Sequence, residues 1–126
     1  MQDKPSAREL LEAVAAFLSE EVAAELSGRK RFHALVAANV ARIVAREIEL
    51  APALLREERR RLTELLGEGG PPAAGDAEAV ARLNEELCRR IRDGWADTQP
   101  TRRRVFDHLR FVVGAKLDID NPRFPR

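Results

Sequence analysis

The side chains that most often perform catalysis or bind metals are scarce in this chain. Its 126 residues contain two histidines, His33 and His108, and a single cysteine, Cys88. Neither histidine has a glutamate three residues before it, so the Glu-x-x-His pairs of di-iron helical proteins are absent, as is any Cys/His cluster for zinc. Cys88 lies among apolar positions of a helical pattern, and we interpret it as a small buried hydrophobic residue. We therefore predict no catalytic residue, no metal and no cofactor.

Polar residues interrupt the apolar stripe of one predicted helix. Phe32, Asn39 and Arg46 recur every seven residues, Glu47 follows directly, and His33 lies on the neighbouring line of the same helix. A polar group buried without a partner costs about 1–3 kcal/mol, so these side chains must be hydrogen-bonded or exposed. Two interpretations stay open. The residues form either a polar cluster that fixes helix register, or a ligand or partner surface made by His33, Asn39 and Glu47.

Arginine and lysine residues come in short clusters, at 29–31, 59–61, 89–92 and 102–104. The first and last clusters fall in the opening turns of predicted helices, where the backbone dipole disfavours cations. Such positions are either tolerated by solvated arginines or mark a docking place for an anion or an acidic protein surface. The net charge is only +1 and aromatic residues are not interleaved with the arginines, so we expect no nucleic-acid partner.

Helical periodicity dominates the first half of the sequence. A capping box of Ser6 and Glu9 opens one helix, and Gly28 is expected to end it. A second helix is predicted at 29–50, and Pro52 fits the first turn of a third. Large apolar residues at three- and four-residue spacing predict the face of each helix that packs in a core. In the second helix these residues are Phe32, Leu35, Val36, Val40, Ile43, Val44 and Ile48.

The second half repeats the pattern after a glycine- and proline-rich segment. Residues 67–75 read GEGGPPAAG and predict a flexible loop; they lack the Lys-Ser/Thr pair of a phosphate-binding P-loop. Asp76 is a plausible N-cap of a fourth helix that Gly94 ends, and Thr98 and Pro100 open a fifth. No segment alternates with a period of two. The sequence thus predicts an all-α fold, a single compact bundle of about five helices, largely up-and-down.

Size and composition favour one soluble domain over residues 1–126. The 44% apolar content supports a packed core, and the chain is too short for two such cores. The first residues lack the apolar region of a secretory signal, and no stretch approaches the roughly 18 apolar residues of a membrane span. We expect a cytoplasmic protein that does not associate with a membrane.

A resemblance to a known family rests on three stretches: MQDKPSARELLEAVAAFL, RFHALVAANVARIVAREIELAPAL and KLDIDNPRF. In order and spacing they resemble a bacterial family of about this length, catalogued largely as a domain of unknown function. The resemblance covers essentially the whole chain and is least specific at 67–104. Members of that family are commonly encoded beside aminoglycoside-phosphotransferase-like kinases and acyl-CoA dehydrogenases. One branch resembles the small accessory subunit of a kinase that phosphorylates 4-hydroxyacyl-CoA thioesters during hydroxy-acid and levulinate breakdown.

The resemblance implies a non-catalytic subunit of such a kinase. The kinase would supply the nucleotide site, the metal and the catalytic aspartate, and this chain would supply a helical surface that stabilises the kinase or completes its acyl-CoA site. We also expect the turn at 120–122 to fold the tail back onto the second helix, since Asn and Pro are turn formers. Matching the family's motif gives these partner- or ligand-surface residues: Arg31, Phe32, His33, Asn39, Glu47, Lys116, Asn121 and Pro122.

Two other functions stay open at this point. A homo-oligomeric structural or small-ligand-binding module, such as a homodimer, would join its copies through an exposed apolar strip on the second or third helix. A stand-alone enzyme acting on acyl-CoA would need His33 or His108 to meet a carboxylate and the substrate carbonyl within hydrogen-bond reach. Such an enzyme is the main competing interpretation from another class, although we favour a non-catalytic chain.

Overall fold

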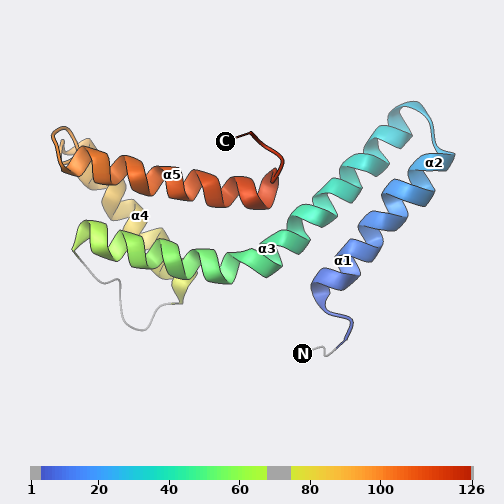
Figure 1. Ribbon diagram of the computed structural model, residues 1–126, viewed down its shortest axis with the longest axis horizontal. Helices are drawn as coiled ribbons and strands as arrows, with labels where there is room; N and C mark the ends of the chain where they lie inside the picture. The colour runs from blue at the N-terminus through green and yellow to red at the C-terminus, as the bar shows by residue number, and fades with distance from the viewer. Residues whose placement is uncertain (1–3, 68–74, 126) are drawn as a thin grey trace. The chain divides into compact units, whose positions relative to one another are not determined.

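The computed structural model describes residues 4–67 and 75–125. In these residues there are helices and no strands, so the prediction of an all-α fold is confirmed (Figure 1). A first helical stretch consists of α1 (Ala7–Ala16), a π-helical segment η1 (Phe17–Val22) and a last turn α2 (Ala23–Glu25), which follow one another without a break. The remaining helices are α3 (Gly28–Leu66), α4 (Asp76–Arg92) and α5 (Thr101–Asp120).

The described residues therefore form four helices, and the prediction of about five is wrong. The predicted second and third helices are one helix, α3, with Pro52 inside it. A proline in a helix removes one backbone hydrogen bond and costs about 3 kcal/mol, but it does not by itself end the helix. Residues 40–51 contain no glycine or asparagine that would cap a helix end, so the helix continues through Pro52.

Contacts within the chain divide it into two compact units, residues 1–51 and residues 52–126. Their boundary falls at Pro52, and α3 contributes its first half to one unit and its second half to the other. The single domain over 1–126 stays a prediction. None of the described helices is long and apolar enough to cross a membrane.

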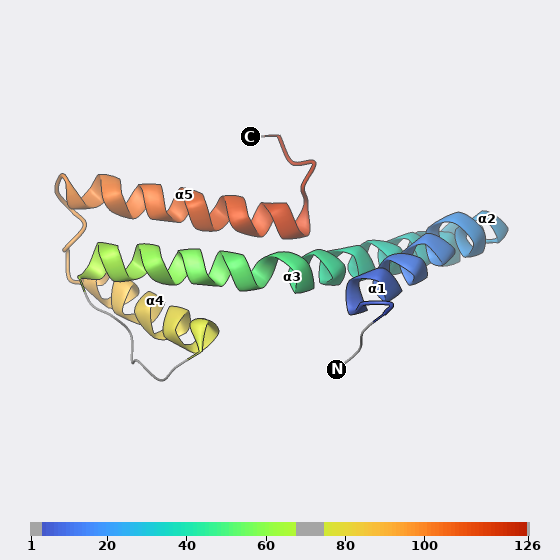
Figure 2. The same ribbon diagram turned by 60° about the horizontal axis from the view of Figure 1, so that its bottom comes forward.

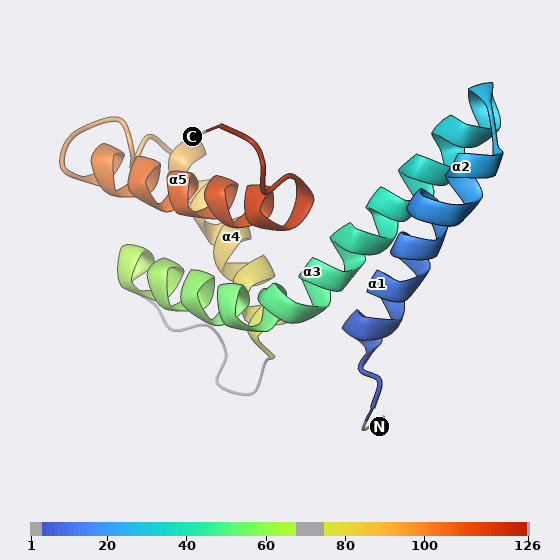
Figure 3. The ribbon, with the colours of Figure 1, turned by 45° about the vertical axis from the view of Figure 1, so that its right-hand side comes forward.

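In the first unit, the first helical stretch lies antiparallel to the first half of α3 (Figures 1 and 3). One end of the pair is joined by an ion pair between Arg8 and Glu49 at 3.5 Å. At the other end, Arg31 Nη1 donates to the carbonyl of Ala23 at 3.2 Å. The residues buried between the two helices are small, which lets the backbones approach closely: Ala15, Ala23, Ala34, Ala38, Ala41 and Ala45.

The large apolar residues of this half of α3 do not form the core that we predicted. Phe32 is 63% exposed and Val40 is 53% exposed, and their neighbours along the same line are also exposed. The packed face is the alanine face, which lies on another side of α3 and has the same three- and four-residue spacing. We call the exposed residues the α3 strip: Phe32, Leu35, Val36, Val40, Val44 and Ile48.

The π-helical segment η1 is tied to α3 by a hydroxyl group. Ser19 donates to the carbonyl of Ala15 at 2.9 Å and accepts from Arg42 Nη2 at 2.9 Å. Short π-helical segments occur often at functional sites. Here the part-buried contact connects the two helices of the first unit, so we interpret it as structural.

In the second unit, α4 and α5 pack on the second half of α3 (Figure 2). Helix α5 is antiparallel to α3, because Arg104 at its start donates to the carbonyl of Glu64 near the end of α3. Helix α4 instead starts beside Arg59 and ends beside Leu66, so this pair lacks the antiparallel arrangement of an up-and-down bundle. The core of the unit consists of Leu62, Leu65, Leu66, Val80, Leu83, Leu87 and Val105.

The observed ends of the helices match the ends predicted from the sequence only in part. The Ser6 capping box is present, with Ser6 Oγ accepting from the Glu9 backbone N–H at 3.2 Å and Glu9 accepting in return. Gly94, at φ +83°, follows the end of α4 as predicted. The first helical stretch ends at Glu25 instead of Gly28, because Leu26 adopts an extended conformation and Gly28 begins α3.

Two further expectations are changed by the structure. Asp76 is the first residue of α4, not its N-cap, and its carboxylate accepts from Arg59 at 3.1 Å. Cys88 is exposed, so its interpretation as a buried residue is wrong. The predicted flexible loop at 67–75 falls mostly on residues 68–74, which lie outside the described residues.

Candidate functional site

The predicted site residues of the first unit lie at the start of α3 and along its exposed side. The rings of Phe32 and His33 meet edge to face, with centroids 5.7 Å apart and an angle of 68°. His33 Nε2 accepts from Arg29 Nε at 3.3 Å, in an exposed position. Asn39 and Glu47 are exposed as well. These polar groups are therefore not buried in a seam but lie beside or between the residues of the α3 strip.

The other predicted residues, Lys116, Asn121 and Pro122, lie at the end of α5 in the second unit and are exposed. The Asn121 backbone N–H donates to the carbonyl of Leu117 at 2.9 Å, and the Phe124 N–H donates to the carbonyl of Asn121 at 2.9 Å. The predicted turn is therefore present, and within its own unit it brings the tail beside α5. Folding of the tail onto the first half of α3 stays a prediction.

This turn completes an apolar hollow on the exposed side of α5, which we call the α5 groove. Its volume is about 370 Å³. At the N-terminal end of α5 it shares Phe106 and Arg110 with a second hollow that is lined further by Gln99, Arg102 and Arg103. An arginine cluster predicted from the sequence thus borders an apolar surface. The groove is lined by Phe106, Leu109, Arg110, Val113, Gly114, Leu117, Phe124 and Pro125.

A cavity between the second half of α3 and α5 was not predicted from the sequence; we call it the α3–α5 cavity. Its volume is about 300 Å³, and His108 is part of its wall. His108 is 4% exposed, and neither ring nitrogen has a hydrogen-bond partner among the described residues. Burial lowers the pKa of His108, the charge of Arg61 lowers it further, and the carboxylate of Glu58 opposes both. The cavity is lined by Arg60, Arg61, Glu64, Leu65, Arg104, Asp107 and His108.

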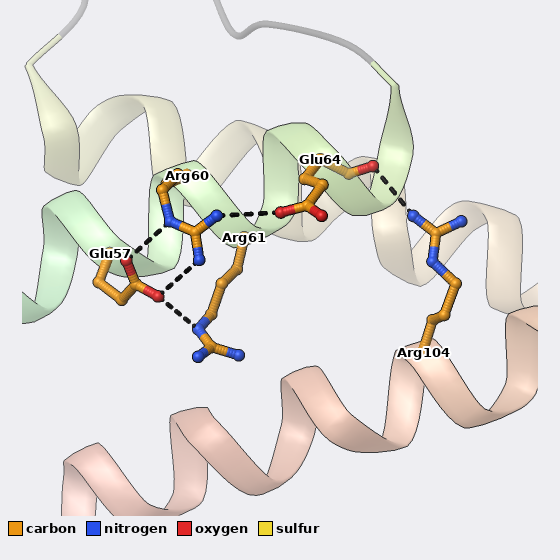
Figure 4. Close-up of polar contacts among 5 residues, drawn as sticks. All are labelled: Glu57, Arg60, Arg61, Glu64 and Arg104. Carbon is orange, nitrogen blue, oxygen red and sulfur yellow. Dashed lines mark hydrogen bonds and ion pairs between the residues drawn. The ribbon is translucent and has the colours of Figure 1, made fainter.

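A network of charges on α3 borders this cavity (Figure 4). The Glu57 carboxylate accepts from Arg60 Nε at 2.8 Å, Arg60 Nη2 at 2.9 Å and Arg61 Nε at 2.8 Å. Hydrogen bonds from Arg60, assisted by Arg61, lower the pKa of Glu57 to about 2. Arg60 also donates to Glu64 at 3.0 Å, so Glu57 and Glu64 hold its guanidinium in place.

Two arginines approach the cavity from opposite helices. Figure 4 shows Arg61 extending from α3 toward α5 and Arg104 extending from α5 toward α3. The guanidinium of Arg61 lies over the ring of Phe111, 4.2 Å from its centroid, which fixes the side chain by a cation–π contact. Arg104 Nη2 donates to the backbone carbonyl of Glu64 at 3.1 Å. Both guanidinium groups are therefore held by contacts that leave donors for another group.

Neither histidine has the carboxylate partner that the enzyme hypothesis requires. His33 is hydrogen-bonded to an arginine, and His108 has no hydrogen-bond partner among the residues that the structure describes. Within residues 4–67 and 75–125 there is no group of three or more His, Cys, Asp or Glu side chains placed to hold a metal ion. Among the residues that the structure describes, neither histidine is hydrogen-bonded to a carboxylate.

Comparison with known proteins places the chain in a family without giving it an activity. No curated protein and no solved structure matches the chain. The family model described as "Domain of unknown function (DUF6285)" matches residues 24–124. The matched region contains all of α3, α4 and α5, and with them the α3 strip, the α3–α5 cavity and the α5 groove except Pro125. The chain belongs to the DUF6285 family.

Proposed function

We propose that this chain is a non-catalytic accessory subunit that docks on a larger enzyme through the α3 strip. The partner is an aminoglycoside-phosphotransferase-like kinase that acts on hydroxyacyl-CoA thioesters in acid catabolism. The kinase performs the chemistry, and the chain stabilises it or completes its acyl-CoA site. The identity of the kinase rests on the resemblance of three sequence stretches, and the docking surface rests on the observations that follow.

The observation that carries the proposal is the exposure of the α3 strip. Six large apolar side chains occur at three- and four-residue spacing, and each has at least 41% of its surface exposed. Soluble monomers rarely expose contiguous apolar patches larger than a few hundred Å², and larger ones mark interaction sites. A helix with anchors at i, i+4 and i+8, as Val36, Val40 and Val44 provide, is suited to a hydrophobic groove of a partner.

Polar residues next to the strip supply the rim that such an interface needs. His33, Asn39 and Glu47 are exposed beside it, and polar rims surrounding an apolar centre are typical of protein interfaces. These are residues that the resemblance to the accessory subunit also selects. We expect the strip to contribute most of the binding energy and the polar residues to set the register of the complex.

The test is co-expression of the tagged chain with an aminoglycoside-phosphotransferase-like kinase of the same organism, followed by affinity capture. The double variant Val40→Asp/Val44→Asp places two charges in the strip and should reduce captured kinase by about tenfold or more, since a buried unpaired charge costs several kcal/mol. Ala77→Asp/Ala81→Asp is the matched control, with the same spacing and added charge on exposed positions of α4. It should capture as much kinase as wild type.

Two further measurements keep this test decisive. The milder Val40→Ala/Val44→Ala variant removes apolar area without adding charge, so it should bind less kinase even if the aspartate variant fails to fold. With ATP and a 4-hydroxyacyl-CoA, phosphorylation should require both proteins together. The proposal would be refuted by a folded strip variant that captures the kinase fully, or by turnover of the acyl-CoA by the chain alone.

A second copy of the chain is the alternative occupant of the same strip. The exposed apolar side chains favour it equally, and a net charge of +1 opposes neither kind of contact. Light scattering of the purified chain distinguishes the two. A mass that stays at 14.1 kDa across concentrations supports the heteromeric docking, whereas a concentration-dependent dimer that Val40→Asp/Val44→Asp abolishes supports a homo-oligomeric module.

A further inference from the structure

We propose that the first helical stretch of one copy of the chain docks in the α5 groove of a second copy. Apolar residues of the stretch fill the groove, and Glu20 and Glu21 meet Arg102 and Arg103. The contact does not use the α3 strip, so it does not depend on the proposed docking of a kinase.

The first reason is that the α5 groove is apolar and open to solvent. Its side chains Phe106, Leu109, Val113 and Phe124 are between 42% and 56% exposed. Along α5 the lining runs from Phe106 to Leu117, which is eleven residues or about 16 Å, and the tail folds back beside the end of the helix (Figure 2). An open groove of this length suits an amphipathic helix, whereas small-molecule sites enclose most of their ligand.

The second reason is unpaired positive charge at one end of this groove. Arg102 and Arg103 line the neighbouring hollow, which shares Phe106 and Arg110 with the groove. Neither the Arg102 nor the Arg103 side chain forms an ion pair or a hydrogen bond with another described residue, whereas Arg110 is paired with Asp107 at 3.0 Å. A helix that fits the groove must therefore be apolar along one side and acidic at one end.

The third reason is that the first helical stretch has this chemistry. Leu10, Val14 and Phe17 are 43%, 51% and 53% exposed and follow one another at i, i+4 and i+7, the spacing of anchors on one side of a helix. Glu20 and Glu21 come next; both are exposed, and neither is paired with another residue that the structure describes. Residues 7–25 contain five glutamates and one arginine.

The order of these residues sets the direction of the contact. In α5 the arginines precede the apolar residues, and in the first helical stretch the glutamates follow them. Both sets therefore match only when the stretch lies antiparallel to the α5 of the other copy. The eleven residues from Leu10 to Glu21 then span about the length of the groove. The negative end of the stretch's backbone dipole also meets the positive end of α5.

The occupant is a second copy because every chain carries both surfaces. The docked helix comes from the first unit and the groove belongs to the second unit, so two copies can form the contact twice. In each copy the stretch still packs on α3 through small residues such as Ala15 and Ala23, and the docking face is a different one. The apolar contact supplies affinity, and the charge pairs at its end select the antiparallel register.

The experiment is sedimentation velocity on the purified full chain at low salt and in the absence of a kinase. The wild-type mass should rise above 14.1 kDa with concentration. Arg102→Glu/Arg103→Glu and Glu20→Arg/Glu21→Arg should each weaken association by about tenfold or more, because attraction becomes repulsion at the end of the contact. An equimolar mixture of these two variants should associate again, since the reversed groove of one then meets the reversed helix of the other.

Two further variants serve as controls. Arg56→Glu/Arg92→Glu changes the charge equally at exposed positions outside the groove and should associate like wild type. Val40→Asp/Val44→Asp should also associate, which separates this contact from a dimer formed through the α3 strip. Circular dichroism of each variant reports that its helices are intact. A mass of 14.1 kDa at every concentration, a mixture of folded variants that fails to associate, or loss of association in the strip variant would overturn the proposal.

Discussion

Replacement of His108 by leucine is expected to stabilise the second unit, although most substitutions at buried positions destabilise a protein. The imidazole is buried and its nitrogens have no hydrogen-bond partner among the described residues. Leucine is similar in size, carries no polar atom and has a higher helix propensity than histidine. The substitution therefore removes an unfavourable contribution without leaving a cavity.

The size of the effect follows from the groups that are removed. A neutral imidazole carries one donor and one acceptor, and a buried group of either kind without a partner costs about 1–3 kcal/mol. Counting one such group as the minimum, leucine should raise the free energy of unfolding of the second unit by about 1–2 kcal/mol. For a unit of this size, each kcal/mol corresponds to a rise in melting temperature of roughly 4–8 °C.

Urea denaturation followed by tryptophan fluorescence measures this change in the relevant unit. Trp95 is the only tryptophan of the chain and packs against the core of the second unit. His33→Leu is the control, since an exposed position should change stability by no more than about 0.5 kcal/mol. A His108→Leu variant less stable than wild type would refute the reasoning, since the imidazole would then make favourable contacts.

Three further predictions test the same packing. The wild type should lose stability below pH 6.5, the ordinary pKa of histidine, because the unfolded chain binds a proton that the folded chain resists; His108→Leu should lack this loss, and urea midpoints against pH decide it. Leu62→Ala, at the largest fully buried side chain among the described residues, should cost about 3–5 kcal/mol by Trp95 fluorescence, and a cost below about 1 kcal/mol would contradict the assigned core. Ala38→Leu should disrupt the alanine contact of the first unit by about 1–3 kcal/mol, seen as lost helical circular dichroism while Trp95 fluorescence is unchanged; a stable variant would contradict that contact.

Helical periodicity predicted the secondary structure well but assigned the core of the first unit to the wrong residues. The sequence contains two stripes on α3 with the same spacing, one of large apolar residues and one of alanines. Hydrophobicity favours the large stripe, yet Ala38 and Ala45 are fully buried and Val40 is exposed. Only the close approach of α1 to α3 selects the alanine face, and that approach is a tertiary property. The spacing of Ala34, Ala38, Ala41 and Ala45 was the signal that could have identified it.

The helix boundary at Pro52 was predicted from the preference of proline for the first turn of a helix. The residues before Pro52 do not end the preceding helix, so the boundary is absent. Pro52 is compatible with the first turn of a helix and also with a helix interior, at a cost of about 3 kcal/mol. The absence of a capping residue before it favours the continuous helix α3. Proline position alone could not decide between these two outcomes.

The α3–α5 cavity could not be predicted from local sequence, because its residues lie about 40 positions apart. Arg60, Arg61 and Glu64 come from one helix, and Arg104 and His108 from another. Within α5, the spacing of Arg104 and His108 by four residues places both on one side of the helix, which was a usable signal. The partner side of the cavity depends on the antiparallel packing of α5 on α3.

The most direct test of the proposed accessory role is sedimentation velocity on the purified chain mixed with the purified kinase. We predict one equimolar complex for the wild-type chain and for Ala77→Asp/Ala81→Asp, and separate species for Val40→Asp/Val44→Asp. Circular dichroism of each variant confirms that its helices are intact. If the wild-type chain and the kinase sediment separately, or if the folded strip variant still forms the complex, the account of the α3 strip as the docking surface is contradicted.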